Sequence, residues 1–123
     1  MENSRVTLSI KPDREYLYNN ISHIRVYNNS TGQVEQDRQV EYNDASELYL
    51  GTLGELKDSS LIVDTFARPP EDYFYNNKLA RVNYEIKYGR QIVESKTVES
   101  QFTDKTFAFL GFRFRFCPRH PFC

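Results

Sequence analysis

Apolar and polar residues alternate in short segments along most of this sequence. The clearest alternation runs from Arg81 to Tyr88, where Val82, Tyr84 and Ile86 are followed by polar neighbours. Successive side chains of a β-strand point to opposite faces, so the pattern predicts a strand with one buried face. Similar segments recur about every ten residues and are separated by turn residues.

The expected strands are Arg5–Lys11, a segment around Ile24 and Val26, Val34–Tyr42, Glu47–Leu53, Leu61–Phe66, Arg81–Tyr88, Gln91–Ser100 and Thr106–Cys117. This succession predicts an all-β fold, an antiparallel β-sandwich of about eight strands, with a small barrel as the alternative. The 123 residues contain nine Tyr and nine Phe, which favour pleated, half-buried surfaces. No linker or repeat divides them, so residues 1–123 are expected to form a single β domain.

The C-terminal part, residues 106–123, combines aromatic and basic residues. Six of the nine phenylalanines lie there: Phe107, Phe109, Phe112, Phe114, Phe116 and Phe122. Strict alternation places Phe109 and Phe112 on opposite faces of a strand. A β-bulge at Gly111 would restore the register and create one continuous aromatic face, with Arg113 and Arg115 opposite. We therefore expect one long bulged strand, followed by a short cysteine-containing tail.

Charge is distributed unevenly along the chain. The first 104 residues contain all 17 acidic residues and 12 of the 16 basic ones. The remaining basic residues are Lys105, Arg113, Arg115 and Arg119. An acidic body and a basic end predict that Phe112, Phe114, Phe116 and the three arginines dock on an acidic protein surface, such as that of a neighbouring copy. The alternative is that the arginines line the solvent face of an edge strand and the aromatic face is ordinary core.

A second candidate for recognition is the connector from Pro69 to Asn77. It carries Tyr73, Phe74 and Tyr75, residue types that often contribute most to protein interfaces. The alternative is that Phe74 covers the core as a lid.

One segment, Ser46–Leu56, has features of both a strand and a helix. Leu50, Leu53 and Leu56 lie at helical spacing, and Ser46 can cap a helix. Glycine inside a helix costs about 1 kcal/mol relative to alanine, and this segment has two. We therefore expect a strand followed by a turn.

The tail contains metal-ligand residue types at intervals of three: Cys117, His120 and Cys123. Thiolates and imidazole suit zinc, but a structural zinc site needs one more ligand than the motif supplies. The other possibilities are a small disulfide ring between the cysteines and two reduced thiols on a C-terminal tail. No metal and no cofactor is expected.

The run from Ile24 to Phe66, with the motif "LYLGTLGELKDSSLIVDTF", resembles the middle strands of fibronectin type III and related immunoglobulin-like domains. The resemblance covers about a third of the chain. It implies an immunoglobulin-like sandwich, with a jelly-roll arrangement as the alternative, and it transfers no functional residue.

Nucleic-acid binding and catalysis find little support in the sequence. The segment Gly111–Phe116 is similar to an RNP1 strand, but that motif carries its last aromatic residue one position further on. Phosphate binding also requires positive charge, and the body is acidic. Carboxylate pairs such as Glu35 and Asp37 are common in solvated segments, and no nucleophile signature accompanies either histidine. Nucleic acid is therefore an unlikely partner and an enzyme is not expected.

Cellular location depends on where the chain begins. No apolar run is long enough to span a membrane, and a chain that starts natively at Met1 is expected in the cytoplasm or in a virion. Secretion is expected only if a leader has been removed.

We expect a non-enzymatic structural or adaptor module that acts through protein contacts, including self-association, as in a viral or phage particle. The alternatives are an extracellular immunoglobulin-like binding domain and a nucleic-acid-binding inhibitor or silencing suppressor.

Overall fold

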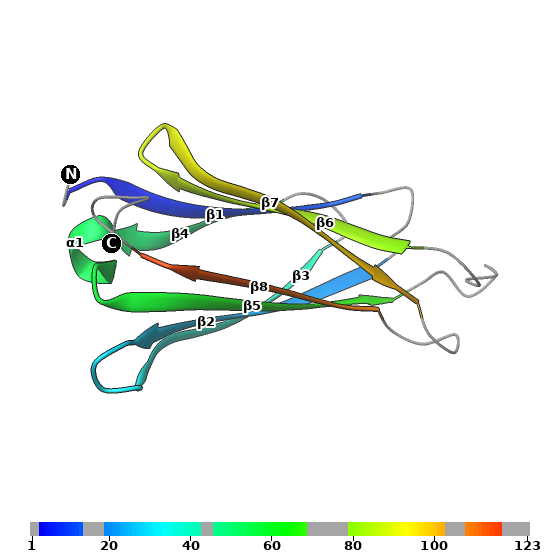
Figure 1. The fold of residues 1–123 in the computed structure, drawn as a ribbon, viewed down its shortest axis with the longest axis horizontal. Helices are drawn as coiled ribbons and strands as arrows, with labels where there is room; N and C mark the ends of the chain where they lie inside the picture. Colours follow the sequence, from blue (N-terminus) through cyan, green and yellow to red (C-terminus); the bar gives the residue numbers. More distant parts are fainter. Residues whose placement is uncertain (1–2, 14–18, 43–45, 69–78, 103–107, 117–123) are drawn as a thin grey trace.

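Two four-stranded antiparallel sheets pack face to face (Figure 1). The structure is a computed structural model that describes residues 3–13, 19–42, 46–68, 79–102 and 108–116. The elements are β1 (Arg5–Pro12), β2 (Asn19–Asn28), β3 (Val34–Tyr42), β4 (Ser46–Thr52), α1 (Leu53–Leu56), β5 (Ser59–Arg68), β6 (Leu79–Tyr88), β7 (Gln91–Gln101) and β8 (Ala108–Arg115). The predicted β-sandwich is confirmed, and the sheets do not close into a barrel.

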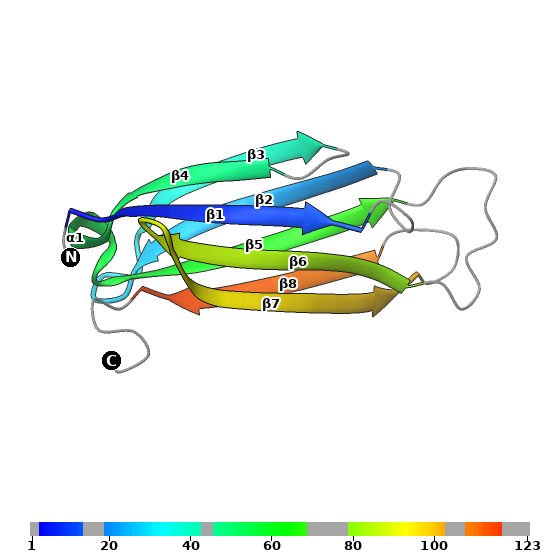
Figure 2. The ribbon, with the colours of Figure 1, turned by 90° about the horizontal axis from the view of Figure 1, so that it is seen from above.

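The strand orders are β4-β1-β6-β7 in one sheet and β3-β2-β5-β8 in the other. Seen from above, β3 and β4 lie along one edge of the sandwich, and β7 and β8 lie along the other (Figure 2). The run Ile24–Phe66 supplies β3 and parts of β2 and β5 to one sheet and β4 to the other, which the hairpin β6–β7 extends.

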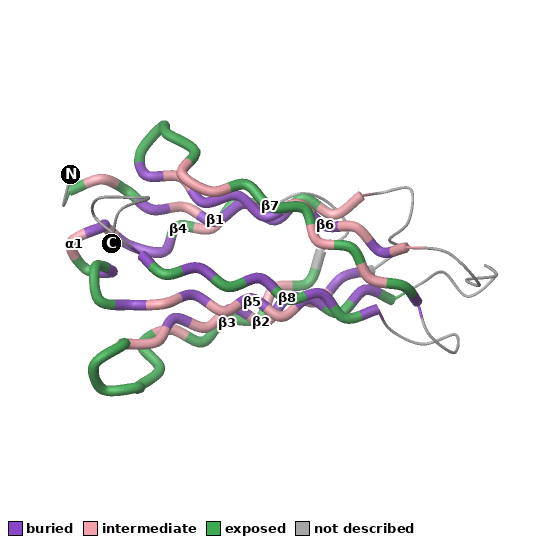
Figure 3. Tube along the Cα trace, in the orientation of Figure 1, coloured by how far each residue is buried: buried purple, intermediate pink, exposed green. Residues whose placement is uncertain are grey.

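The core fills the space between the sheets. Along β5 and β8, buried and more exposed residues alternate, whereas β1 and β6 each contain three consecutive buried residues (Figure 3). The aromatic rings of Tyr84 from β6 and Phe112 from β8 stack across the sandwich, with centroids 5.0 Å apart and planes at 7°. The hydroxyl of Tyr84 donates a hydrogen bond to Oγ1 of Thr65, which also bonds Oγ of Ser22. This buried contact joins the two sheets without leaving the three hydroxyl groups unpaired.

The segment after β4 differs in detail from the expected turn. Residues Leu53–Leu56 form one helical turn, and its N-cap is Thr52 instead of Ser46. Thr52 and Glu55 form a capping box, in which hydrogen bonds from the backbone and hydroxyl of Thr52 hold the pKa of Glu55 below its ordinary value. Within the described parts of the chain, no helix has the length and apolar character needed to cross a membrane.

The bulge expected at Gly111 is wrong. Strand β8 pairs with β5 from Ala67↔Ala108 to Ser60↔Arg115 without a register shift. Phe109 therefore points to the outer face, where 52% of it is exposed, and the expected continuous aromatic face does not form. The rings of Phe112, Phe114 and Phe116 lie in the core instead. The described strand covers eight residues and not the whole of Thr106–Cys117.

The inward face of β6 provides a first test of the packing. Ile86 is fully buried, so Ile86→Ala should lower the free energy of unfolding by about 2–5 kcal/mol in urea denaturation. Lys87 is its neighbour on the outer face, and Lys87→Ala should change the same quantity by less than about 0.5 kcal/mol. A loss below about 0.5 kcal/mol for Ile86→Ala would show that the buried face is wrongly assigned.

Candidate interaction edge

Each sheet has two edge strands, and β8 differs from the other three. The ladders that hold β3, β4 and β7 each contain a register shift, at Val26/Tyr27, Val6/Thr7 and Ile86/Lys87 respectively. Such bulges are one way in which proteins prevent an edge strand from pairing with another chain. The β5–β8 ladder is regular throughout. Strand β8 is therefore the one described edge strand whose ladder is regular along its whole length; in β3 the shift lies at the Val34 end, and the ladder from Gln36 to Tyr42 is regular.

The hydrogen bonds of β8 show which of its backbone groups are free for a partner strand. The N–H of Phe116 donates to the carbonyl of Ser59 at 3.1 Å. In an antiparallel ladder such bonded pairs occur at every second residue. Counting back from Phe116, every second residue of β8 therefore forms backbone hydrogen bonds with β5. The four residues in between, Phe109, Gly111, Arg113 and Arg115, direct their N–H and C=O groups towards the open edge.

These four residues are also exposed, and three of them, Phe109, Arg113 and Arg115, carry side chains. Phe109 packs edge-on against Phe66 of β5, with ring centroids 5.2 Å apart. Arg113 and Arg115 follow on the same face, and neither forms a salt bridge with another described residue. Aromatic and arginine side chains are enriched in protein interfaces. The open edge thus combines unpaired backbone groups with side chains suited to protein contacts.

Gly111 creates a gap in this row of side chains. It lies opposite Asp64 of β5, whose carboxylate accepts a hydrogen bond from Arg25 at 2.9 Å. A Cβ atom at position 111 would lie 3.8 Å from the ring of Phe109 and 4.0 Å from Oδ1 of Asp64. These are ordinary contact distances, so the position accepts alanine.

The residues predicted to mediate interactions have three different outcomes. Arg113 and Arg115 are exposed on the face of β8 opposite Phe112 and Phe114, as expected. Phe112, Phe114 and Phe116 are at most 8% exposed, so the core alternative describes them. The others, Tyr73, Phe74, Tyr75 and Arg119, lie outside the described residues.

The metal-ligand candidates Cys117, His120 and Cys123 also lie outside the described residues. Within the described ranges, no three His, Cys, Asp or Glu side chains are grouped so that they can hold a metal ion.

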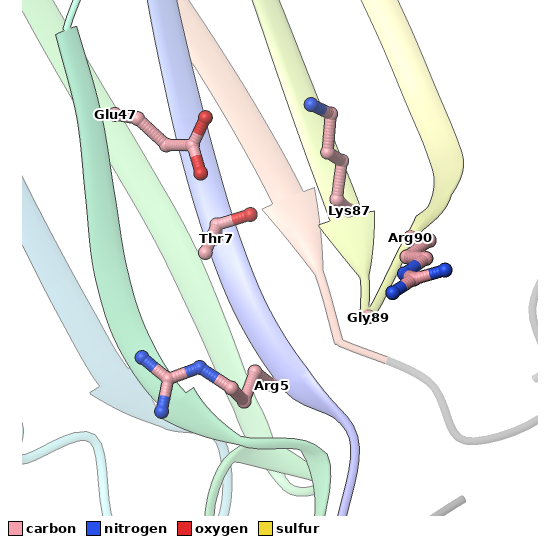
Figure 4. Close-up of a pocket in the computed structure, with 6 residues that line it drawn as sticks. All are labelled: Arg5, Thr7, Glu47, Lys87, Gly89 and Arg90. Carbon is pink, nitrogen blue, oxygen red and sulfur yellow. The ribbon is translucent and has the colours of Figure 1, made fainter.

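Sequence analysis missed a shallow depression on the outer face of the other sheet. Its volume is about 520 Å³, and its lining comprises Arg5, Thr7, Glu47, Lys87, Gly89 and Arg90 (Figure 4). The guanidinium of Arg5 lies 4.0 Å from the ring centroid of Tyr49. The lining is formed by β1, β4, β6 and the β6–β7 turn, and no sequence motif brings these positions together. Its described residues include no nucleophile–base pair of the type used in covalent catalysis.

No protein-family model matches the chain, and no curated protein matches its sequence.

Proposed function

We propose that the protein is a non-enzymatic structural or adaptor module that binds other proteins by adding a strand to the open edge of β8. The observation that carries this proposal is the regular, bulge-free pairing of β8 with β5 on one side only. In strand addition, backbone hydrogen bonds supply affinity and alternate side chains supply specificity. Backbone N–H and C=O groups project from Phe109, Gly111, Arg113 and Arg115, and exposed side chains are present at all of these positions except Gly111.

The charges of this edge indicate the chemistry of the partner strand. Arg113 and Arg115 favour acidic residues on the outer face of that strand, because complementary charges select the partner and its orientation. The opposite face of the added strand would extend the apolar core beside Phe112 and Phe114, which favours apolar residues there. The preferred partner strand thus carries acidic residues on its outer face, and a peptide of alternating valine and glutamate is a simple probe for it.

We place such a module in the cytoplasm or in a viral or phage particle. Small β domains in such particles act through contacts with neighbouring proteins. This placement is consistent with the best-supported site of the chain, which is a sheet edge suited to protein contacts.

Strand addition can be tested by removing one backbone donor from the open edge. Proline at position 111 lacks the N–H that points away from β5, so it should leave the β5–β8 bonds intact. We expect Gly111→Pro to weaken binding of a peptide of alternating valine and glutamate by about 10- to 100-fold in calorimetry, because a partner carbonyl loses its donor.

Gly111→Ala is the matched control, since it adds a similar Cβ and keeps the donor. It should bind the peptide as the unmodified protein does, and circular dichroism should show that both variants remain folded. Equal peptide binding by the two variants, or none by Gly111→Ala, would contradict the proposal.

A further inference from the structure

The edge strand at the other end of the same sheet, β3, has complementary charge. Strands β3 and β8 lie on opposite edges of the molecule (Figure 2). Residues Val34–Tyr42 include Glu35, Asp37 and Glu41 but a single basic residue, Arg38. Asp37 and Glu41 are exposed. Strand β8 contains two arginines and no acidic residue.

The backbone of β3 is also directed correctly to accept a strand. The N–H of Asn29 donates to the carbonyl of Asp58 at 2.8 Å, just beyond the regular β2–β5 ladder. Bonded pairs occur at every second residue of an antiparallel ladder. The odd-numbered residues of β2 therefore form hydrogen bonds with β5, and the even-numbered residues form them with β3. Residues of β3 opposite even-numbered β2 residues, such as Arg38 opposite Ile24, therefore bond β2. Asp37, Gln39 and Glu41 lie opposite odd-numbered residues, so their N–H and C=O groups point outwards.

Strand direction permits a head-to-tail contact. The pairs β3–β2, β2–β5 and β5–β8 are all antiparallel. If a second copy is placed beside β8 in the same orientation, its β3 runs antiparallel to β8. The second sheet has the same property, because β4, β1, β6 and β7 also alternate in direction. The strand directions of both sheets are therefore compatible with such a contact.

The outer faces of the two edges then meet with opposite charge. In a register that sets Arg115 of one copy opposite Asp37 of the next, Arg113 would lie opposite Gln39 and diagonal to both Asp37 and Glu41. In a two-fold contact between two β8 strands, the four arginines would instead gather in one interface. Complementary charge therefore favours the head-to-tail arrangement.

We infer that the strand added to β8 is β3 of a second copy of this chain. The inference rests on the proposed function and names its partner. Each copy keeps a free β8 at one end and a free β3 at the other, so the assembly grows as a filament or closes as a ring.

Charge reversal on the two edges provides the test. One variant carries Arg113→Glu and Arg115→Glu, and the other carries Asp37→Arg and Glu41→Arg. All four positions are exposed, and Asp37→Arg also removes the exposed contact of Asp37 with His23. Circular dichroism should show that both variants fold. Each should self-associate about tenfold or more weakly than the unmodified chain in sedimentation velocity, because like charges oppose each other across the contact. An equimolar mixture should recover association, since the reversed β8 edge then meets the reversed β3 edge, and the two unmodified edges meet each other, in both cases with opposite charge.

A control variant, Lys87→Glu with Arg90→Glu, changes the net charge as much as the β8 variant but alters the sheet face far from β8 and β3. It should associate like the unmodified chain, and a loss as large as that of the β8 variant would overturn the inference. Three further results would do so: an unmodified chain that stays monomeric at high concentration, a mixture that does not recover, and dimers unaffected by Asp37→Arg and Glu41→Arg. If the valine–glutamate peptide still distinguishes Gly111→Ala from Gly111→Pro, strand addition at β8 stands and the second copy is excluded as its partner.

Discussion

A chain that ends at Gly111 should not fold. The truncation removes Phe112, Phe114 and Phe116, which are 2%, 8% and 1% exposed. Loss of each such ring costs about 3–5 kcal/mol, and three losses approach the total of about 5–15 kcal/mol that stabilises a typical domain. The truncation also leaves half of β5 without its partner strand. Circular dichroism should show loss of the β-sheet signal.

The matched control replaces the outer face of the same strand in the full-length chain. A variant with Phe109→Ser, Arg113→Ser and Arg115→Ser keeps the buried rings and should remain folded. A folded product from the truncated chain would show that β8 is an appended arm and not part of the core.

The second large effect is expected at Tyr84, which connects the two sheets. Tyr84→Ala should lower the free energy of unfolding by about 3–5 kcal/mol, because it removes a fully buried ring and its stack with Phe112. Tyr84→Phe keeps the ring and removes only the hydrogen bond of 2.6 Å to Thr65. Its cost should be about 0.5–1.5 kcal/mol, since Thr65 still bonds Ser22.

Urea unfolding of the two variants separates the ring from the hydroxyl group. Equal losses would mean that the buried hydroxyl network, and not aromatic packing, joins the sheets at this point.

The positions of the strands were predictable because the relevant signal is local. Val82, Tyr84, Ile86 and Tyr88 alternate with polar residues, and all four are buried. The turn at Gly89 is similarly readable, because its φ of 62° is a conformation that glycine adopts without strain. The helical turn after β4 was missed because its cap, Thr52, is also the last residue of that strand, and the competing cap at Ser46 matched the longer leucine pattern.

The candidate site was predictable in part. Arg113 and Arg115 were placed opposite the buried aromatic residues of their strand from alternation alone, and their exposure agrees with this. The face of Phe109 was predicted wrongly, because a bulge was expected at Gly111 and the regular pairing of β8 with β5 excludes it. A bulge at Gly111 would have satisfied the local pattern equally well.

The sequence by itself determined that the chain forms eight strands and which side chains of the clearest strands are buried, since a period of two requires only neighbouring residues. Tertiary structure decided which strands became edges, which ladders acquired bulges and which backbone groups remained open. These properties depend on pairing between distant strands, such as β5 with β8 and β2 with β3. Strand pairing placed the basic strand β8 and the acidic strand β3 at the two edges of one sheet. Only this arrangement makes their charges recognisable as complementary.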